Sequence, residues 1–228
     1  RRTAEEQATS GHTTAASDAA SDTGGAPQAV DLGVAICTFN SERTIGATLA
    51  SVHGLAARII VVDSGSTDGT MSICDRFGAE VIQRPWPGMT LQRRFAMDQC
   101  DANEWVLSLD SDEAPDEVQQ AAIREAVARN DPAYAGWQIN RKIWFEGGWA
   151  HHVYQPEWRL RLARRGAYRV LGIGPEGRGG HDRVEVDGKV GRLPGVCRHD
   201  SWASIGELHR RNAGRAERAA QYQEPGGG

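Results

Sequence analysis

The amino-acid sequence predicts one α/β domain built on an open, mostly parallel β-sheet. Short apolar segments alternate with amphipathic segments between residues 32 and 129, which is the pattern of βαβ units. Residues 58–63 and 105–110 are apolar on both faces, as expected of strands inside a parallel sheet. Residues 1–29 contain no Leu, Ile, Phe, Met, Trp, Tyr, Val or Cys, so we expect a disordered tail outside the domain.

The predicted elements follow one another with short connections. An apolar strand at 32–39 is followed by Asn40-Ser41-Glu42, which is typical of a helix start. We then expect a strand at 58–63, a helix at 67–78 that ends at Gly78, a strand at 80–83, a helix at 91–100, a strand at 105–110 and a helix at 115–129 with Pro115 in its first turn. Beyond residue 134 the chain becomes β-rich, aromatic and basic, and an Arg- and Ala-rich helix is expected over 204–223.

Composition restricts the class of protein. The net charge of −4 over 228 residues gives no indication of nucleic acid as a partner. No apolar run reaches the roughly 18 residues that a membrane-spanning helix requires, and no segment resembles a secretion leader. The four cysteines lack CxxC or zinc-site spacing, so we expect reduced, mostly buried thiols in a cytoplasmic protein.

Polar residues follow three of the predicted strands. The first strand leads into Thr38-Phe39-Asn40, the second into residues 63–69 (DSGSTDG) and the fourth into residues 110–113 (DSDE). Ligands of open α/β sheets bind beyond the carboxyl ends of the strands. We therefore expect the three clusters to meet in one crevice.

Asp110 and Asp112 are the strongest candidates for a metal site. Carboxylates at i and i+2 after a buried strand can bind one hard cation, with a diphosphate supplying further oxygen ligands. In isolation this spacing favours a solvated turn and a helix cap before Pro115, but together with the other clusters it predicts Mg²⁺ or Mn²⁺. We also expect that only a cation and a diphosphate offset the repulsion between the two carboxylates.

Asp63 has two possible roles at the end of its strand. It can cap the turn Ser64-Gly65-Ser66, or accept a hydrogen bond from a nucleotide base or ribose. Gly65 permits a tight turn and close approach of a ligand to the backbone.

The motifs resemble a known family. CTFNSERTIGATLASV, IIVVDSGSTDGT and LSLDSDE resemble glycosyltransferase family 2 in order and spacing. PEWRLRLARRG, HDRVEVDGKVGRL and CRHDSW resemble its bacterial lipopolysaccharide-core glucosyltransferase subgroup. The resemblance covers residues 32–218. It implies a GT-A fold over residues 30–223, with a nucleotide-sugar half at 30–130 and an acceptor half at 131–223. Residues 224–228 are expected to form a disordered end.

The resemblance also implies an activity and a set of site residues. The activity is inverting transfer of a sugar from UDP-glucose or a similar UDP-sugar to a glycan or lipopolysaccharide-core acceptor. The implied donor-site residues are Thr38, Asn40 and Glu42 around the nucleotide, Asp63 at the base, and Asp110 and Asp112 at the metal and phosphates. Ser64, Gly65 and Ser111 lie in the same turns and are further candidates for the donor site, as is Arg161.

The general base is expected in the second half of the chain, because the acceptor approaches opposite the nucleotide. In the resembling subgroup a His-Glu pair stands where this chain has His181-Asp182, so the resemblance assigns the base to Asp182. His181, Glu185 and Asp187 also qualify by chemistry alone, and the alternative is a polar turn between strands.

Other polar and aromatic residues of the second half have two interpretations each. His199 can complete the cation site or lie in a turn that begins a helix. Arginines of one predicted strand can bind phosphate or form a solvated face. Strand alternation places Arg159, Arg161 and Arg165 on one face and Arg164 on the other. Trp144, Trp149 and Trp158 can stack on sugar rings, but core packing is expected for at least two of them.

The expected partners are a nucleotide-sugar donor and a glycan or glycolipid acceptor. Arginines of the last helix allow peripheral contact with an anionic membrane, although a solvated helix face is favoured. The competing functions are a nucleotidyltransferase, which would need a Gly-rich basic loop after the first strand, and a nucleotide-sugar binder without catalysis.

Overall fold

The computed structural model describes residues 29–151, 155–173 and 181–202, together with Ser204 and Gly206. The expected tail, the Gly-rich segment 174–180 and nearly all of the expected last helix lie outside these residues. The first half of the chain alternates strands and helices in the order β1 (Val30–Thr38), α1 (Ile45–Val52), β2 (Ala56–Asp63), α2 (Thr70–Arg76), β3 (Glu80–Gln83), α3 (Met89–Asp98) and β4 (Trp105–Asp110).

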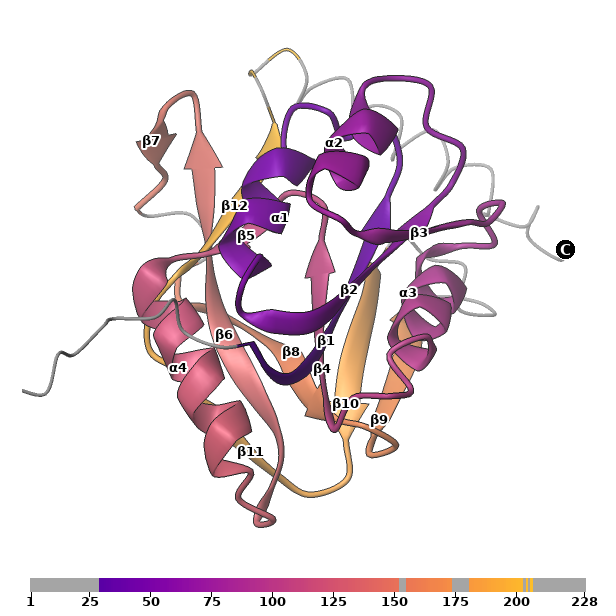
Figure 1. Ribbon diagram of the computed structural model, residues 1–228. Coiled ribbons are helices and arrows are strands. Elements are labelled where there is room, and N and C mark those ends of the chain that lie inside the picture. Colours follow the sequence, from indigo (N-terminus) through magenta and orange to yellow (C-terminus); the bar gives the residue numbers. More distant parts are fainter. Residues whose placement is uncertain (1–28, 152–154, 174–180, 203, 205, 207–228) are drawn as a thin grey trace, which may run out of the picture.

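The second half is rich in strands, as predicted. Its elements are β5 (Glu113–Pro115), α4 (Glu117–Arg129), β6 (Tyr134–Phe145), β7 (Gly148–Trp149), β8 (Glu157–Arg164), β9 (Tyr168–Ile173), β10 (His181–Val186), β11 (Lys189–Arg192) and β12 (Cys197–Trp202). Among the described residues, ten strands form one sheet. Eight of them follow the path β3-β2-β1-β4-β8-β6-β12-β5, and β7 and β11 each pair with β6 off this path (Figure 1). Strands β9 and β10 form a second sheet.

The main sheet changes character at β4. Strands β3, β2, β1 and β4 are mutually parallel, whereas β8 runs antiparallel to both β4 and β6. The parallel part is the predicted βαβ region. The mixed part comes mostly from residues 134–202, for which acceptor binding stays a prediction. The prediction of an α/β fold with a mostly parallel sheet is therefore confirmed.

Both faces of the parallel part are covered, which makes its strands apolar on both sides. Leu32, Val34 and Ile36 of β1 belong to one core cluster with residues of α1 and α4. Ala35 and Cys37 alternate with them and belong to a second cluster with α3, β9 and β10. The small β9–β10 sheet thus lies on the α3 side, where Figure 1 also places it. This packing brings Asp182 of β10 next to α3.

Two expectations about local structure are wrong, at Pro115 and at Arg165, and two alternative interpretations are excluded. Pro115 ends strand β5, and α4 begins after Asp116, whose side chain accepts a hydrogen bond from Gln119 N at 2.8 Å. Residues 181–186 form strand β10, which excludes the alternative of a polar turn. His199 lies within strand β12, which excludes the alternative of a turn that begins a helix. Arg165 follows β8, so it does not continue the expected alternation. In each strand, pairing with a distant segment decides the local conformation.

The prediction of core packing for two of three tryptophans is also wrong. Trp144 and Trp158 are half-buried, and Trp149 is exposed. Each ring has a cation over it, contributed by Arg198, Arg192 and Lys142 respectively. The core tryptophan is Trp105, which is 1% exposed.

The four cysteines are free and buried, as expected. Burial raises the pKa of Cys37 to about 12. No helix in the described part of the chain is long and apolar enough to cross a bilayer.

Candidate active site

The loops after β1 and β2 are joined by reciprocal hydrogen bonds. Asn40 N donates to Ser66 Oγ at 2.8 Å, and Thr67 N donates to Asn40 Oδ1 at 2.8 Å. Glu42 Oε2 accepts from Gly69 N at 2.8 Å, and Glu42 N donates to Asp68 Oδ2 at 3.1 Å. The left-handed φ of 48° at Asn40 turns the chain toward the second loop. Asn40 and Glu42 therefore hold the loop after β2 against the loop after β1.

The loop after β4 joins the same edge. Ser111 Oγ lies 2.8 Å from Ser41 Oγ, and Ser111 O accepts from Thr48 Oγ1 at 3.0 Å. The three predicted clusters are thus brought together at the carboxyl ends of β1, β2 and β4. Thr38 is buried beside them, and its Oγ1 has no hydrogen-bond partner among the described residues.

Asp63 caps its own turn. Its Oδ2 accepts from Gly65 N and Ser66 N, both at 2.9 Å, and its Oδ1 accepts from Ser66 Oγ at 2.5 Å. Gly65 has a φ of 95°, which the turn requires and which a side chain would strain. Ser64 Oγ accepts from Gln92 Nε2 at 3.2 Å. Asp63 is fully buried, and both of its oxygens accept hydrogen bonds within its own turn. Its contact with a nucleotide base stays a prediction.

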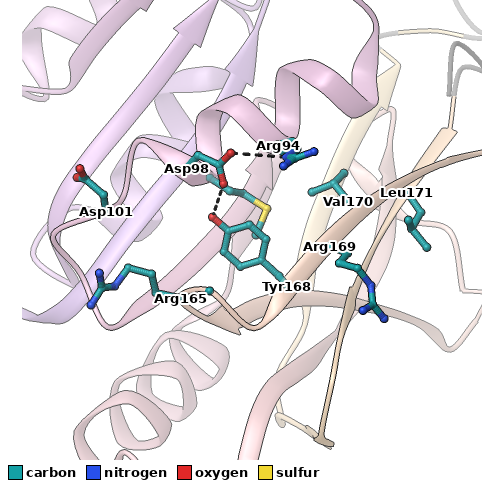
Figure 2. Close-up of a pocket in the computed structure, with 10 residues that line it drawn as sticks. Arg94, Asp98, Asp101, Arg165, Tyr168, Arg169, Val170 and Leu171 are labelled. Atoms are coloured by element: carbon teal, nitrogen blue, oxygen red, sulfur yellow. Dashed lines mark hydrogen bonds and ion pairs between the residues drawn. The ribbon is translucent and has the colours of Figure 1, made fainter. Parts of the chain in front are cut away.

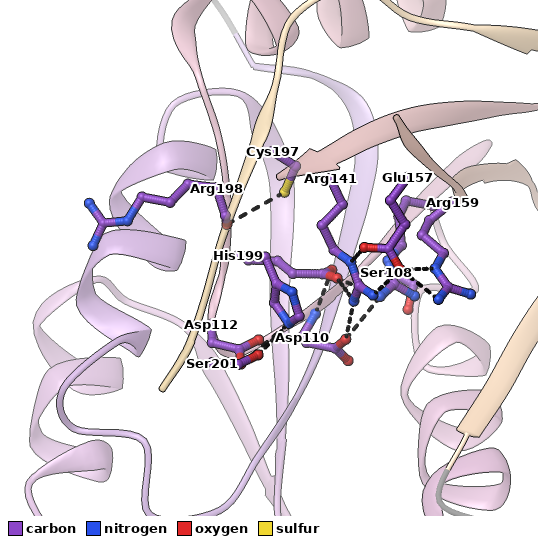
Figure 3. Close-up of polar contacts among 12 residues, drawn as sticks. Ser108, Asp110, Asp112, Arg141, Glu157, Arg159, Cys197, Arg198, His199 and Ser201 are labelled. Atoms are coloured by element: carbon purple, nitrogen blue, oxygen red, sulfur yellow. Dashed lines mark hydrogen bonds and ion pairs between the residues drawn. The ribbon is translucent and has the colours of Figure 1, made fainter. Parts of the chain in front are cut away.

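Asp110 is bound by two arginines. Arg93 Nη2 donates to its Oδ1 at 2.6 Å, and Arg161 Nη2 donates to its Oδ2 at 2.9 Å. Arg141 lies on the same side, with its Nη1 3.8 Å from Asp110 Oδ2 (Figure 3). Burial opposes the charged form, but Arg93, Arg161 and Arg141 outweigh it and hold the pKa of Asp110 well below its usual value. The expectation that only a cation and a diphosphate offset the charge of this pair is therefore wrong.

Glu113 extends this network into the core. Its Oε1 accepts from Arg161 Nη2 at 2.6 Å and Arg141 Nη1 at 2.9 Å, and its Oε2 accepts from Asp110 N at 3.1 Å. Arg141 also forms a two-pronged ion pair with Glu157. Arg161 therefore faces the buried network, which excludes the alternative of a solvated strand face at this position, and its contact with the donor stays a prediction.

Asp112 has a different environment. Its Oδ2 accepts from Ser201 Oγ at 3.0 Å and lies 3.7 Å from His199 Nε2, while its Oδ1 is buried without a partner among the described residues. Burial raises the pKa of Asp112, His199 opposes this, and the charges of Asp110 and Glu113 add to the rise. His199 Nδ1 is also buried and unpartnered within the described part of the chain.

Both unsatisfied atoms are of a kind that can ligate a divalent cation. A carboxylate oxygen and an imidazole nitrogen are ordinary ligands of Mn²⁺, and a cation would favour the charged form of Asp112. No cluster of three or more His, Cys, Asp or Glu side chains suited to a metal occurs among the described residues. Asp112 and His199 would hold the cation together with ligands from a bound diphosphate.

Asp182 lies at the other end of the arginine network. Arg93 Nε donates to Asp182 Oδ2, so one guanidinium joins Asp182 and Asp110. The Asp182 side chain is 7% exposed. Glu185 and Asp187 instead pair with Arg183 and Arg169 near the surface. The side chain of His181 lies outside the described part of the structure.

Sequence reasoning missed Arg93, Arg141 and the role of Glu113, although periodicity contained a signal for two of them. Arg93 precedes Ala96 and Met97 by three and four residues, so it shares their buried helix face. Arg141 lies between Ile139 and Ile143 at strand spacing, so it shares their buried face.

A separate cavity lies at the opposite end of β4. It has a volume of about 530 Å³ and is lined by residues that include Arg94, Asp98 and Tyr168 (Figure 2). Trp105, which begins β4, pairs with Arg164 just before the cavity residue Arg165. The cavity is thus distant from Asp110, which ends the same strand.

The parallel sheet, the convergent loops and the acidic turn after β4 are the features expected of a GT-A fold. Residues 33–184 match the family Glycosyl transferase family 2, so the chain belongs to this family. It is 32% identical over 179 residues to an uncharacterised glycosyltransferase of Rickettsia typhi, covering 76% of this chain and 61% of that protein. It is also 32% identical over 162 residues to the lipopolysaccharide core biosynthesis glycosyltransferase LpsC of Rhizobium meliloti, covering 65% of this chain and 59% of LpsC. The chain thus spans about three fifths of the length of these relatives.

Solved structures confirm the GT-A-like fold. Glucosyl-3-phosphoglycerate synthase from Mycobacterium tuberculosis, in complex with Mn²⁺, UDP and phosphoglyceric acid, matches with a TM-score of 0.50 and 20% identity, covering 87% of this chain and 81% of the synthase. GalNAc-T7 with UDP, GalNAc and Mn²⁺ matches with a TM-score of 0.51 and 12% identity, covering 78% of this chain and 45% of GalNAc-T7.

Proposed function

We propose that this protein transfers a sugar from UDP-glucose or a similar UDP-sugar to a glycan or lipopolysaccharide-core acceptor, with a divalent cation and inversion at the anomeric carbon. The observation that carries the proposal is the pair of buried, unsatisfied ligand atoms on Asp112 and His199, next to the loops after β1 and β2. The kinship with LpsC supports the acceptor class, and the UDP and Mn²⁺ complexes of proteins with the same fold support the donor and cation.

The two aspartates after β4 have separate roles in this proposal. Asp112, with His199, holds the cation, which when bound neutralises charge on the donor diphosphate. Asp110 is already paired with Arg93 and Arg161. It therefore holds these arginines in place. Its backbone N also donates to Glu113, and this hydrogen bond fixes the turn that carries Asp112. Its direct contact with the donor stays a prediction.

Asp182 is the proposed general base. Its Oδ2 is bound by Arg93, while its Oδ1 has no hydrogen bond to any described residue. The guanidinium stabilises the charged carboxylate, and Oδ1 stays available to accept a proton from the acceptor hydroxyl. A carboxylate in the β9–β10 sheet can approach the sugar from the side opposite to the nucleotide loops, as an inverting displacement requires.

The test is donor turnover with a set of nucleotide sugars, each with Mn²⁺, with Mg²⁺ and with EDTA. Asp182→Asn should lower kcat by about 10²–10⁴ while UDP binding changes little. Asp187→Asn, an exposed carboxylate on the loop after the same strand, is the matched control and should keep its activity. Near-normal turnover by Asp182→Asn would remove the base assignment. Donor binding without turnover by the wild-type protein would instead favour a non-catalytic binder.

A further inference from the structure

Arg93 is a buried arginine with three polar partners, each in a different direction. Its side chain is 2% exposed. Nε donates to Asp182 Oδ2, Nη1 donates to Ser108 Oγ at 2.8 Å, and Nη2 donates to Asp110 Oδ1 at 2.6 Å. All three edges of the planar guanidinium are therefore occupied.

These partners belong to parts of the fold that are otherwise joined mainly by apolar packing, with one hydrogen bond from Tyr168 Oη of β9 to Asp98 Oδ1 of α3 at 2.9 Å. Ser108 and Asp110 lie on β4 in the main sheet, whereas Asp182 lies on β10 in the separate β9–β10 sheet. Apolar residues of α3, β9 and β10 pack in one cluster, but such contacts are not directional and do not fix the rotation of a carboxylate. The Arg93 hydrogen bonds supply a fixed direction.

We infer that Arg93 is a positioning residue, which sets the Asp182 carboxylate in its reactive orientation relative to the donor site. This inference rests on the proposed role of Asp182 as the base. The Ser108 and Asp110 contacts fix the plane of the guanidinium, and Nε then fixes Oδ2 of Asp182. Oδ1 is thereby left toward the acceptor. Charge neutralisation alone would not require this geometry, since a lysine ammonium supplies the same charge as a single point.

The distinguishing variant is therefore Arg93→Lys. It keeps the positive charge but replaces the planar guanidinium, with its donors in three directions, by a single ammonium group. A displacement of about 1 Å in a reacting group can cost on the order of 10²-fold in rate. We expect Arg93→Lys to lower kcat for UDP-glucose hydrolysis in Mn²⁺ by about 10- to 100-fold, with a smaller change in KM. The matched control is Arg94→Lys, because Arg94 is the next residue of α3, has a 68% exposed side chain and contacts Asp98. It should leave kcat unchanged.

A double-mutant cycle tests whether Arg93 acts through Asp182. In an Asp182→Asn background, Arg93→Lys should cause no further loss of kcat, because the residue that it positions is already inactive. The same loss in both backgrounds would overturn the inference while leaving Asp182 as the base. Near-normal turnover by Asp182→Asn alone would overturn the base assignment and this inference together.

Ser108→Ala provides a second variant in case Arg93→Lys does not fold. It removes one hydrogen bond from the guanidinium without changing any charge, and Ser108 Oγ is buried away from solvent. We expect a smaller loss of kcat that likewise disappears in the Asp182→Asn background. A folded Ser108→Ala variant with unchanged kcat would count against a positioning role for Arg93.

Discussion

Replacing Glu113 by Gln removes one negative charge from a buried network and adds an amide donor beside two guanidinium groups. Glu113 is 0% exposed and accepts from Arg161, Arg141 and the backbone N of Asp110. The network contains four carboxylates (Asp110, Glu113, Glu157, Asp182) and four guanidinium groups (Arg93, Arg141, Arg159, Arg161). The wild-type network is neutral in formal charge, and the variant network carries an excess of one positive charge.

The cost follows from the burial of the arginines that lose their partner. The side chains of Arg161 and Arg141 are 7% and 12% exposed, so water compensates little of the unpaired charge. Breaking a buried ion pair by removing one partner costs about 3–5 kcal/mol in free energy of unfolding. A domain of this size loses about 2–4 °C in Tm per kcal/mol, so we expect a fall of about 6–20 °C.

Thermal unfolding followed by circular dichroism at pH 7 measures this difference. The matched control is Glu125→Gln, because Glu125 pairs with Arg129 on the surface of α4 and both side chains are about two-thirds exposed. Such exposed helix pairs contribute about 0.3–0.5 kcal/mol, so the control should lose only about 1–2 °C. Equal losses in the two variants would refute the assignment of a buried, charge-balanced network.

Three further predictions concern the cation, acid stability and the thiols. Mn²⁺ with UDP should raise the Tm of the wild-type protein and of the exposed-site control Asp101→Asn, but not of Asp112→Asn; an equal rise in all three would contradict the cation site. Arg141 outweighs the effect of burial and lowers the pKa of Glu157 from 4.5 to about 2. This group therefore stabilises the fold above pH 4.5 and loses that effect as pH falls toward 2. Tm measured across this range should fall less steeply in Glu157→Gln, and an unchanged slope would contradict the ion pair. Because burial raises the pKa of Cys37 and the other thiols are buried too, iodoacetamide at pH 8 should label none of the four cysteines rapidly before unfolding, as mass spectrometry can show.

The nucleotide half could be predicted from sequence because its signals are local. Strands β3 and β4 have the predicted bounds, and β2 begins two residues earlier than predicted. Uninterrupted apolar runs identify strands that are covered on both faces, and turn residues mark their carboxyl ends. Since the carboxyl ends of parallel strands lie at one edge, the same reasoning brought the loops after β1, β2 and β4 together correctly.

The second half and the charge network depend on pairing between distant segments, which sequence reasoning did not provide. Strand β5 contains Pro115 because Cys197 of β12 pairs with it. His199 enters a strand for the same reason, as β12 also pairs with β6. The arginines bound to Asp110 come from α3 and β8, 17 and 51 positions away in the sequence. Their residue types were visible, but no local pattern identifies their partners.

Asp110 and Asp112 are not equivalent in this protein. Asp110 is the last residue of β4, where it pairs with Arg93 and Arg161, and its negative charge is compensated before any ligand binds. Asp112 lies on the turn, has only Ser201 and His199 as described side-chain partners, and keeps one buried oxygen unsatisfied. A cation approaching this turn therefore meets one carboxylate whose charge is largely neutralised and one that still lacks a counter-charge. Substitution of Asp112 should act mainly on cation binding, whereas substitution of Asp110 should also disturb the arginine that joins it to Asp182.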